Sequence, residues 1–239
     1  MDADATDGPD PNRPFDGPEW RVSRTLRDGT EVTLRPVMPE DREEMRRGIL
    51  ELSPDSRYLR FFAGMGAPSE QMLDYLTRVD QDHHVAICAT LTSPDLKTER
   101  GIGVARFVRL EGAPEIAEGA ITVVDDMQGK GLGQCLAIEL GRAAALRGVR
   151  VLRAEVLATN TKMREILEGA GAVAVADRDD DPDTVSYDLA LPPPDQEDAL
   201  ARHERSMVEI LRGAAETMAM TIRRLLPPAL RPDGDDATR

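Results

Sequence analysis

Apolar residues recur at two different spacings along the middle of the chain, and the alternation of these spacings predicts a domain of the α/β or α+β class. Apolar runs of strand length predict strands over residues 20–26, 32–37, 84–91, 102–110, 116–124, 151–156, 172–176 and 185–189. Apolar residues three or four positions apart predict helices over residues 39–52, from residue 53 onward, and over residues 69–79, 132–147 and 161–169. We therefore expect a mixed central sheet of about six to seven strands flanked by helices.

Turn and cap residues support the elements at the start of this domain. Asp28-Gly29 separates the first two expected strands, and this dipeptide accommodates the positive φ angles of a tight hairpin turn. Ser53 and Pro54 suit the cap and the first position of a helix. The domain is thus expected to begin with a β-hairpin and to continue in helices before an antiparallel meander.

Both ends of the chain differ in composition from the expected domain, which spans residues 20–191. Residues 1–19 are rich in Asp, Pro and Gly and hold too little apolar surface to offset the entropy of ordering, so they predict a disordered acidic tail. Residues 195–227 predict one long amphipathic helix, and residues 228–239 predict a second disordered tail. We expect the helix either to pack back on the domain or to mediate self-association or partner docking.

Net charge and cysteine content limit the kinds of binding partner and the cellular location that we expect. The 239 residues carry a formal net charge of -14, which argues against nucleic-acid binding because that requires patches of Lys and Arg. An acidic surface suits cationic partners such as amines, and it equally suits plain solubility. No apolar run approaches the ~20 residues of a membrane span, and the acidic start lacks the features of a secretory signal. Because Cys88 and Cys135 lie in apolar runs, we expect no disulfide framework and a cytoplasmic location.

A glycine-rich segment over residues 125–134 lies between an expected strand and an expected helix. Glycine lets the main chain approach a ligand closely, and the first N–H groups of a helix lack acceptors, so this segment is either a phosphate-binding loop or a tight turn without a ligand. Its spacing excludes a Walker A loop, and a dinucleotide fingerprint counted from Gly129 fails at Gln134. The spacing does fit Gln/Arg-x-x-Gly-x-Gly/Ala, with the defining positions at Gln128, Gly131 and Gly133.

This motif resembles the pyrophosphate-binding signature of the GCN5-related N-acetyltransferases (GNAT), and the resemblance extends over about residues 21–190. The chain is similar to the acetyltransferase domain of bacterial protein-lysine acetyltransferases of the Pat type. The stretches that carry the likeness are residues 26–32, 35–36, 52–62, 117–121, 125–133 and 155–163. The resemblance implies the GNAT fold, acetyl-CoA as a cosubstrate and an amine as the acceptor.

The resemblance also implies where acetyl-CoA binds. The strand at 116–124 would splay from the parallel strand at 151–156, and the pantetheine arm would lie in that gap along Thr122, Val123 and Val124. The residues implied to hold the pyrophosphate are Gln128, Gly129, Lys130, Gly131, Leu132, Gly133 and Gln134. Lys130 either contacts phosphate or is solvated. Asn160 matches the asparagine with which the family contacts the cofactor, and it equally suits a helix cap.

Glu118 is the candidate general base, because it stands in the run Ala117-Glu118-Gly119-Ala120, where Pat-like enzymes place their catalytic glutamate. An amine acceptor arrives protonated and must lose a proton before it attacks. Four residues of extended strand separate Glu118 from Thr122 by ~13 Å, so the carboxylate would act through water or a bulge. Many GNAT enzymes carry a tyrosine acid where this chain has Leu167, and solvent or the released proton would then protonate the leaving thiolate.

Three functions follow from this reading. The first is acetyl transfer to a protein lysine ε-amine, the second is transfer to a small-molecule amine, and the third is a non-catalytic acyl-CoA-binding regulator that acts through its C-terminal helix. We expect no metal site, because His83-His84 lacks partners at ligand spacing. Cys135 is expected in the core rather than as a nucleophile.

Overall fold

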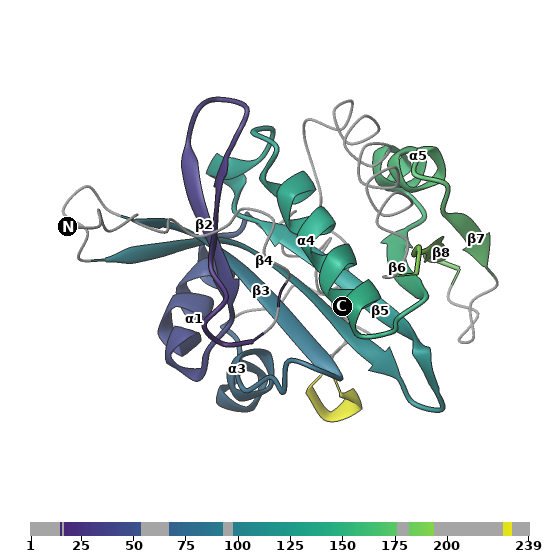
Figure 1. The fold of residues 1–239 in the computed structure, drawn as a ribbon, viewed down its shortest axis with the longest axis horizontal. Coiled ribbons are helices and arrows are strands. Elements are labelled where there is room, and N and C mark those ends of the chain that lie inside the picture. The colour runs from purple at the N-terminus through teal and green to yellow at the C-terminus, as the bar shows by residue number, and fades with distance from the viewer. Residues whose placement is uncertain are drawn as a thin grey trace, which may run out of the picture.

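Eight strands form one mixed sheet in the computed structural model, which describes residues 15, 17–53, 67–92, 98–175, 182–193 and 227–230 (Figure 1). The strands are β1 (Val22–Thr25), β2 (Glu31–Pro36), β3 (His84–Thr92), β4 (Glu99–Leu110), β5 (Ala113–Val123), β6 (Val151–Leu157), β7 (Val173–Val175) and β8 (Thr184–Ala190). The helices are α1 (Arg42–Glu51), α3 (Glu70–Thr77), α4 (Leu132–Leu146) and α5 (Thr161–Gly169), with short 3-10 turns η1 (Pro39–Asp41), η2 (Asp125–Met127) and η3 (Pro228–Leu230). The expected fold class is confirmed, although the sheet is larger than the six or seven strands expected.

The strand order is β1-β2-β3-β4-β5-β6-β8-β7. Neighbouring strands run antiparallel except β5 and β6, which are parallel and are joined by the crossover helix α4. The hairpin expected at Asp28-Gly29 joins β1 to β2: Gly29 has a φ of 85°, and the Asp28 carboxylate accepts the N–H of Thr30 at 3.0 Å. This hairpin brings the turn after β1 towards the start of α4.

The helices divide between the two faces of the sheet (Figure 1). On the face covered by α4, the alternate side chains Ile87, Phe107 and Ile121 pack with Leu136 and Leu140 in the main apolar core. Helix α5 packs on the same face over β6 and β8. Every second residue of the strands and every third or fourth residue of α4 thus pack together in one continuous core.

Helices α1 and α3 cover the opposite face, and ion pairs join them. Arg42 contacts both Glu70 and Asp74, and Arg46 contacts Glu70 at 2.7 Å. Ser69 caps α3 by accepting the N–H of Met72 at 3.1 Å, at the start of the helix expected over residues 69–79. These contacts hold the two helices together as a cover over β3, β4 and β5.

Two described side chains near the ends of the chain pack on the domain, although the sequence predicted disordered tails at both positions. Phe15 falls in the expected acidic tail, yet it is 2% exposed, packs edge-on against Trp20 at 5.0 Å and lies under the guanidinium of Arg147. Leu230 falls in the second expected tail and packs beside α3. One aromatic or aliphatic side chain is enough to anchor a short segment when the domain offers an apolar surface. The helix expected from residue 53 onward and the helix expected over 195–227 lie outside the described residues.

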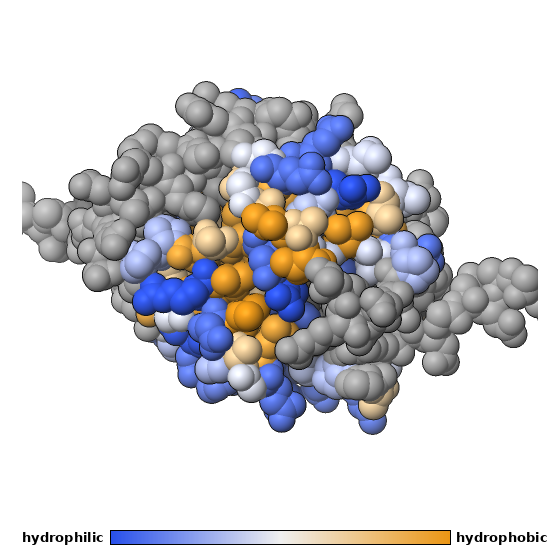
Figure 2. All heavy atoms as spheres, turned by 90° about the vertical axis from the view of Figure 1, so that its right-hand side faces the viewer, coloured by the Kyte–Doolittle hydropathy of each residue, from blue (hydrophilic) through white to orange (hydrophobic). Residues whose placement is uncertain are grey.

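The side of the molecule at which the sheet ends in β7 presents apolar patches interrupted by hydrophilic side chains (Figure 2). Val173, in this edge strand, is 65% exposed. Among the residues described, no helix has both the length and the apolar composition needed to cross a bilayer.

Candidate functional site

The parallel strands β5 and β6 separate after a short stretch of pairing. They pair only between residues 116–118 and 151–153. From Gly119 to Val123, β5 continues to pair with β4, while the rest of β6 pairs with β8. The splay implied by the family resemblance is therefore present, and within the described strands the β6 side of β5 is left without a strand partner.

The glycine-rich segment follows β5 and turns into α4 with two residues in the left-handed region. Gly129 has a φ of 76° and Gly131 a φ of 93°, and Gly131 is the N-terminal boundary residue of α4. The first helical hydrogen bond runs from the N–H of Cys135 to the carbonyl of Gly131 at 3.2 Å. In the part of the chain that the structure describes, the N–H groups of residues 129–134 have no acceptor. This row of unpaired donors at a helix N-terminus is suited to an anion.

The tip of the β1–β2 hairpin lies against this loop. The N–H of Arg27 donates to the carbonyl of Lys130 at 3.1 Å, and its guanidinium donates to Gln134 at 2.9 Å. A side chain at Gly131 would stand 3.4 Å from the Arg27 side chain, so glycine leaves room for this arginine. The ammonium of Lys130 lies 3.3 Å from the Asp28 carboxylate. The Lys130 side chain is 36% exposed in this ion pair, and its contact with a phosphate stays a prediction.

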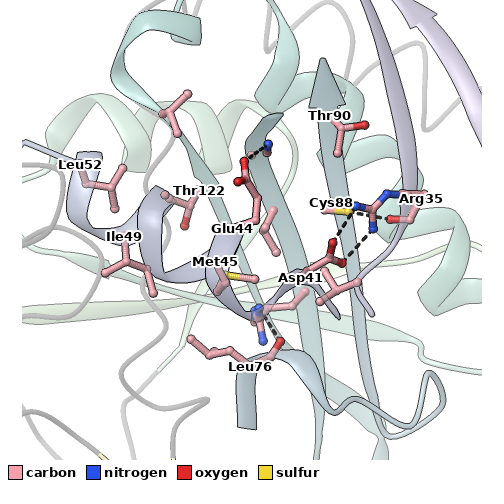
Figure 3. Close-up of a pocket in the computed structure, with 17 residues that line it drawn as sticks. Arg35, Asp41, Glu44, Met45, Ile49, Leu52, Leu76, Cys88, Thr90 and Thr122 are labelled. Carbon is pink, nitrogen blue, oxygen red and sulfur yellow. Dashed lines mark hydrogen bonds and ion pairs between the residues drawn. The ribbon is translucent and has the colours of Figure 1, made fainter. Parts of the chain in front are cut away.

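A pocket lies between α1 and strands β3 to β5, on the face opposite α4 (Figure 3). Met45 and Ile49 of α1 and Leu52, which follows this helix, form one side of it, and Thr122 of β5 forms part of the other. The other lining residues are Arg35, Val37, Asp41, Glu44, Gly48, Leu76, Cys88, Thr90, Gly101, Gly103, Val104, Arg106 and Val124. Two of the three residues implied to flank the pantetheine arm therefore line this pocket. The third, Val123, packs in the core beneath α4.

Thr122 carries a buried hydroxyl that has no hydrogen-bond partner among the described residues. A buried hydroxyl without a partner is costly, and proteins tolerate it mainly where a ligand or water completes the site. The Thr122 hydroxyl therefore favours a ligand-binding site where β5 separates from β6.

Arg106 is a buried cation beneath the pocket, and it is 1% exposed. Its Nη2 donates to the carbonyl of Leu76 at 3.3 Å, and its Nη1 lies 3.1 Å from Nε2 of His84. Because a guanidinium has only donors, Nε2 of His84 accepts, and the proton of the imidazole is on Nδ1. Burial lowers the pKa of Arg106 to about 10, so the guanidinium stays charged at neutral pH. Burial, helped by the charge of Arg106, lowers the pKa of His84 to about 3, so the imidazole is neutral.

Glu118 lies on the same face of β5 as Thr122, opposite Val108 of β4. Its side chain is half-buried and is not among the residues that line the pocket. Burial raises the pKa of the Tyr75 phenol, and the charge of Glu118 adds to this rise, which places the two groups near each other. The structure therefore brings Glu118 and Thr122 to one face, roughly 13 Å apart along the strand.

Asn160 caps α5, because its side-chain oxygen accepts the N–H of Met163 at 3.1 Å. The capping role expected for it is confirmed, and it places Asn160 at the end of β6 beyond the splay. Leu167 is 8% exposed and packs with Val156 in the apolar cluster beneath α5. That position offers no proton donor.

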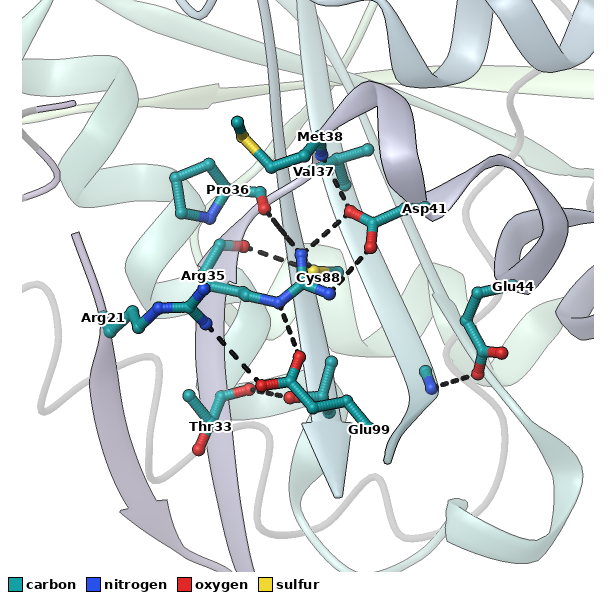
Figure 4. Close-up of polar contacts among 12 residues, drawn as sticks. Arg21, Thr33, Arg35, Pro36, Val37, Met38, Asp41, Glu44, Cys88 and Glu99 are labelled. Carbon is teal, nitrogen blue, oxygen red and sulfur yellow. Dashed lines mark hydrogen bonds and ion pairs between the residues drawn. The ribbon is translucent and has the colours of Figure 1, made fainter. Parts of the chain in front are cut away.

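A buried ion cluster fixes the start of α1 over the pocket (Figure 4). Arg35 donates to both oxygens of Asp41 at 2.7 and 2.8 Å and to Glu99 at 2.9 Å. The hydrogen bond with Asp41 raises the pKa of Arg35. Burial raises the pKa of the neighbouring Cys88 to about 12, so this sulfur is a thiol at neutral pH and is not a nucleophile. The cluster is structural, and it positions η1 and therefore α1.

Three residues at this site were missed from the sequence. Arg106 had a signal, since it is an isolated arginine between Ala105 and Phe107 in an otherwise apolar strand, at a position that alternation assigns to a covered face. Gly48 had a weaker signal, a glycine within a helix. Arg27 had none, because only the fold brings the hairpin turn to the glycine loop.

Comparison with known proteins agrees with this geometry. A family model described as an acetyltransferase (GNAT) domain matches residues 31–173. Over 175 residues, 71% of this chain, the sequence is 37% identical to the acetyltransferase Pat of Mycolicibacterium smegmatis; the match covers 49% of that protein, so the chain spans about half the length of this relative. It is 34% identical to an acetyltransferase of Pseudomonas aeruginosa over 178 residues, which cover 74% of this chain and 91% of the relative.

A solved structure extends the likeness to three dimensions. The GNAT domain of PAT from S. lividans superposes with a TM-score of 0.64 at 29% sequence identity, over 72% of this chain and 97% of that domain. The chain belongs to the GNAT acetyltransferase family, whose members use acetyl-CoA as cosubstrate and an amine as acceptor.

Proposed function

We propose that this acetyltransferase acts on protein lysine ε-amines, with acetyl-CoA held by the glycine loop and Glu118 as the general base. The observation that carries this proposal is the continuity of one strand. β5 holds Glu118, then the orphaned hydroxyl of Thr122, and then leads into the unpaired N–H groups of residues 129–134. The pyrophosphate, the thioester and the base would therefore follow one another along β5 and the loop after it.

The donor would bind mainly through main-chain groups. The N–H groups of residues 129–134 would bind the pyrophosphate, since they point out of a helix N-terminus and lack acceptors in the described chain. Arg27 lies against Gly131 and would add a cation beside them. The pantetheine arm would follow the open side of β5 along residues 122–124, with Asn160 on the opposite strand end.

The chemical step is a direct transfer. Glu118, acting through a water molecule, removes a proton from the lysine ammonium. The free amine attacks the thioester carbonyl, a C–N bond forms, and collapse of the tetrahedral intermediate breaks the C–S bond. A main-chain N–H near Thr122 would stabilise the oxyanion. Because Leu167 offers no proton, the departing thiolate takes its proton from solvent or from the one released by the amine.

A lysine acceptor suits the charge of the molecule. The chain carries a formal net charge of -14, so its field attracts cationic side chains. The resemblance of the sequence to Pat-type protein-lysine acetyltransferases favours the same conclusion.

The exchange Glu118→Gln tests the base. We expect turnover to fall by about 100- to 10,000-fold, as is typical when a general base is lost. The dissociation constant of acetyl-CoA, measured by calorimetry, should stay within error of the parent. Glu115→Gln is the matched control, because Glu115 is an exposed carboxylate on the same strand. Parental turnover in Glu118→Gln would remove Glu118 from the mechanism.

The acceptor class is tested by mass spectrometry of a lysine-rich protein and of a panel of free amines after incubation with labelled acetyl-CoA. Label on protein lysines supports the proposal. Label on free amines alone would make the enzyme a small-molecule acetyltransferase. Binding of acetyl-CoA without transfer to any acceptor would instead favour the regulator, which is the reading that Leu167 in place of tyrosine supports.

We also propose a cytoplasmic location and self-association or partner docking through residues 195–227. Both cysteines are free thiols, which suits a reducing compartment. Sedimentation of a chain truncated after Pro194 tests the helix, and an unchanged oligomeric state would exclude self-association through it.

A further inference from the structure

Gly48 stands in the middle of α1, although glycine is among the least favourable residues inside a helix. Neither of the usual reasons for glycine applies here. Its φ is not positive, and a Cβ at this position would meet no atom within 4 Å. The space beside Gly48 is therefore open space in the pocket. A helix that keeps a glycine facing unfilled space suits a ligand that occupies this space.

The walls around this space are largely apolar. The apolar residues that line it are Met45 and Ile49 of α1, Leu52 just after this helix, Leu76 of α3 and Val104 of β4. The carboxylates that also line the pocket are already engaged. Arg35 binds both oxygens of Asp41, and the N–H of Gly101 donates to Glu44. Such a lining favours an apolar group over a charged one.

The position of the pocket shows which apolar group would reach it. Thr122 and Val124 line the pocket, and these residues are the ones along which the thioester arm is proposed to lie. Glu118, the proposed base for the acceptor amine, does not line it. The pocket thus adjoins the donor end of the site rather than the entry of the acceptor. An acyl chain attached at the thioester fits this place better than the aliphatic part of an acceptor lysine.

We propose that this pocket binds the chain of a linear, apolar acyl group longer than acetyl, such as butanoyl or hexanoyl, and that Gly48 sets the chain length it admits. The inference rests on the proposed donor site along β5. The chemistry is unchanged: the acyl C–S bond breaks, an acyl C–N bond forms, and the amine proton passes to the base.

The test compares acetyl-, butanoyl- and hexanoyl-CoA with the full-length protein, by calorimetry and by turnover with one lysine substrate. Each buried methylene strengthens binding by about fourfold, so butanoyl-CoA should bind about fifteenfold more tightly than acetyl-CoA. Gly48→Leu should abolish this ratio, and Gly48→Ala should reduce it. Both substitutions favour the helix, which guards against loss of folding.

Gly141→Ala is the matched control, since Gly141 lies within α4 on the opposite face and its Cβ would make only an ordinary contact, 3.9 Å from Leu191. This variant should keep the parental ratio. An unchanged butanoyl-to-acetyl ratio in Gly48→Leu would overturn the proposal, and so would an effect confined to the KM of the amine, which would assign the pocket to the acceptor.

The experiment distinguishes a wrong assignment of the acyl pocket from a wrong assignment of the donor site. If acetyl-CoA binds and is turned over but longer chains bring no gain, only the acyl pocket is refuted. If none of the three thioesters binds, the donor site along β5 is refuted as well.

Discussion

The two faces of the sheet are built from different kinds of side chain. Beneath α4, aliphatic and aromatic side chains form one continuous core, and the buried polar side chains of α4, Glu139 and Gln134, are paired with arginines of the β1–β2 hairpin. Beneath α1 and α3, the buried set includes Arg35, His84, Thr90 and Arg106, together with the pocket. The same strands, β3 to β5, contribute alternate residues to both faces.

The difference separates stability from chemistry within a single sheet. Burial of apolar surface on the α4 face drives folding, and this contribution is non-directional and depends mainly on the area buried. The opposite face keeps a charged guanidinium, a neutral imidazole and an unpartnered hydroxyl away from water, which costs free energy. A protein retains such groups where they serve a site, so we assign stability mainly to the first face and substrate handling to the second.

The largest expected effect on stability comes from truncating one buried leucine on each face of the sheet. Leu140→Ala beneath α4 and Leu76→Ala beside the pocket remove equally buried side chains, 2% and 1% exposed. Each should lower the free energy of unfolding by about 2–5 kcal/mol. Only Leu76→Ala should also lower kcat/KM per folded molecule. Urea unfolding and steady-state kinetics check both, and equal kinetic effects of the two variants would contradict the division between the faces.

A second comparison sets two glycines at the ends of α4 against each other. Gly131 and Gly148 have φ values of 93° and 79°, so alanine at either position should cost about 1–2 kcal/mol of stability. Gly131→Ala should in addition weaken coenzyme A binding, because the strain distorts the row of unpaired N–H groups. Gly148→Ala should not, since a Cβ there meets nothing within 4 Å and the site is at the far end of the helix. Calorimetric titration with coenzyme A distinguishes the two.

The buried histidine predicts a pH dependence of stability. The pKa of His84 is about 3 in the folded protein and about 6.5 when the chain is unfolded, so between these values the unfolded state binds the extra proton. His84 therefore lowers stability as the pH falls from 6.5, by at most about 1.4 kcal/mol per pH unit. The groups that face the ring are Arg106, Asp80 and Tyr75.

His84→Gln keeps an acceptor for Arg106 and removes the titration, so its stability should fall less steeply in urea unfolding between pH 7.5 and pH 4.5. His83→Gln is the control, because the side chain of His83 is 71% exposed. A parental slope in His84→Gln would mean that other groups cause the acid sensitivity.

The smallest effect is expected at Thr122. Thr122→Val removes a buried hydroxyl that has no partner in the described part of the chain, so it should raise stability by about 1 kcal/mol. Turnover should fall, because that oxygen lies at the proposed thioester end. Thr90→Val is the opposite case, since the Thr90 hydroxyl donates to the carbonyl of Thr33 at 3.4 Å and its loss should lower stability. Thermal unfolding of the two variants should shift in opposite directions.

The parts of the site that the sequence predicted are those made by the main chain. The spacing of Gln128, Gly131 and Gly133 predicts a loop of exposed N–H groups, because glycine readily adopts the positive φ angles that such a loop requires. The hairpin at Asp28-Gly29 and the caps at Ser69 and Asn160 were predictable for the same local reason. The burial of Phe15 was not, since nothing near it in the chain indicates which apolar surface it will meet.

The sequence by itself determined the strand and helix periods, the glycine loop and the family, because each is a property of neighbouring residues. Only the tertiary structure decided that Arg27 meets Gly131, that Arg106 is buried against His84, and that Gly48 faces an open pocket beside Thr122. These contacts join residues far apart in the chain. They depend on strand order and helix placement, which no local pattern specifies.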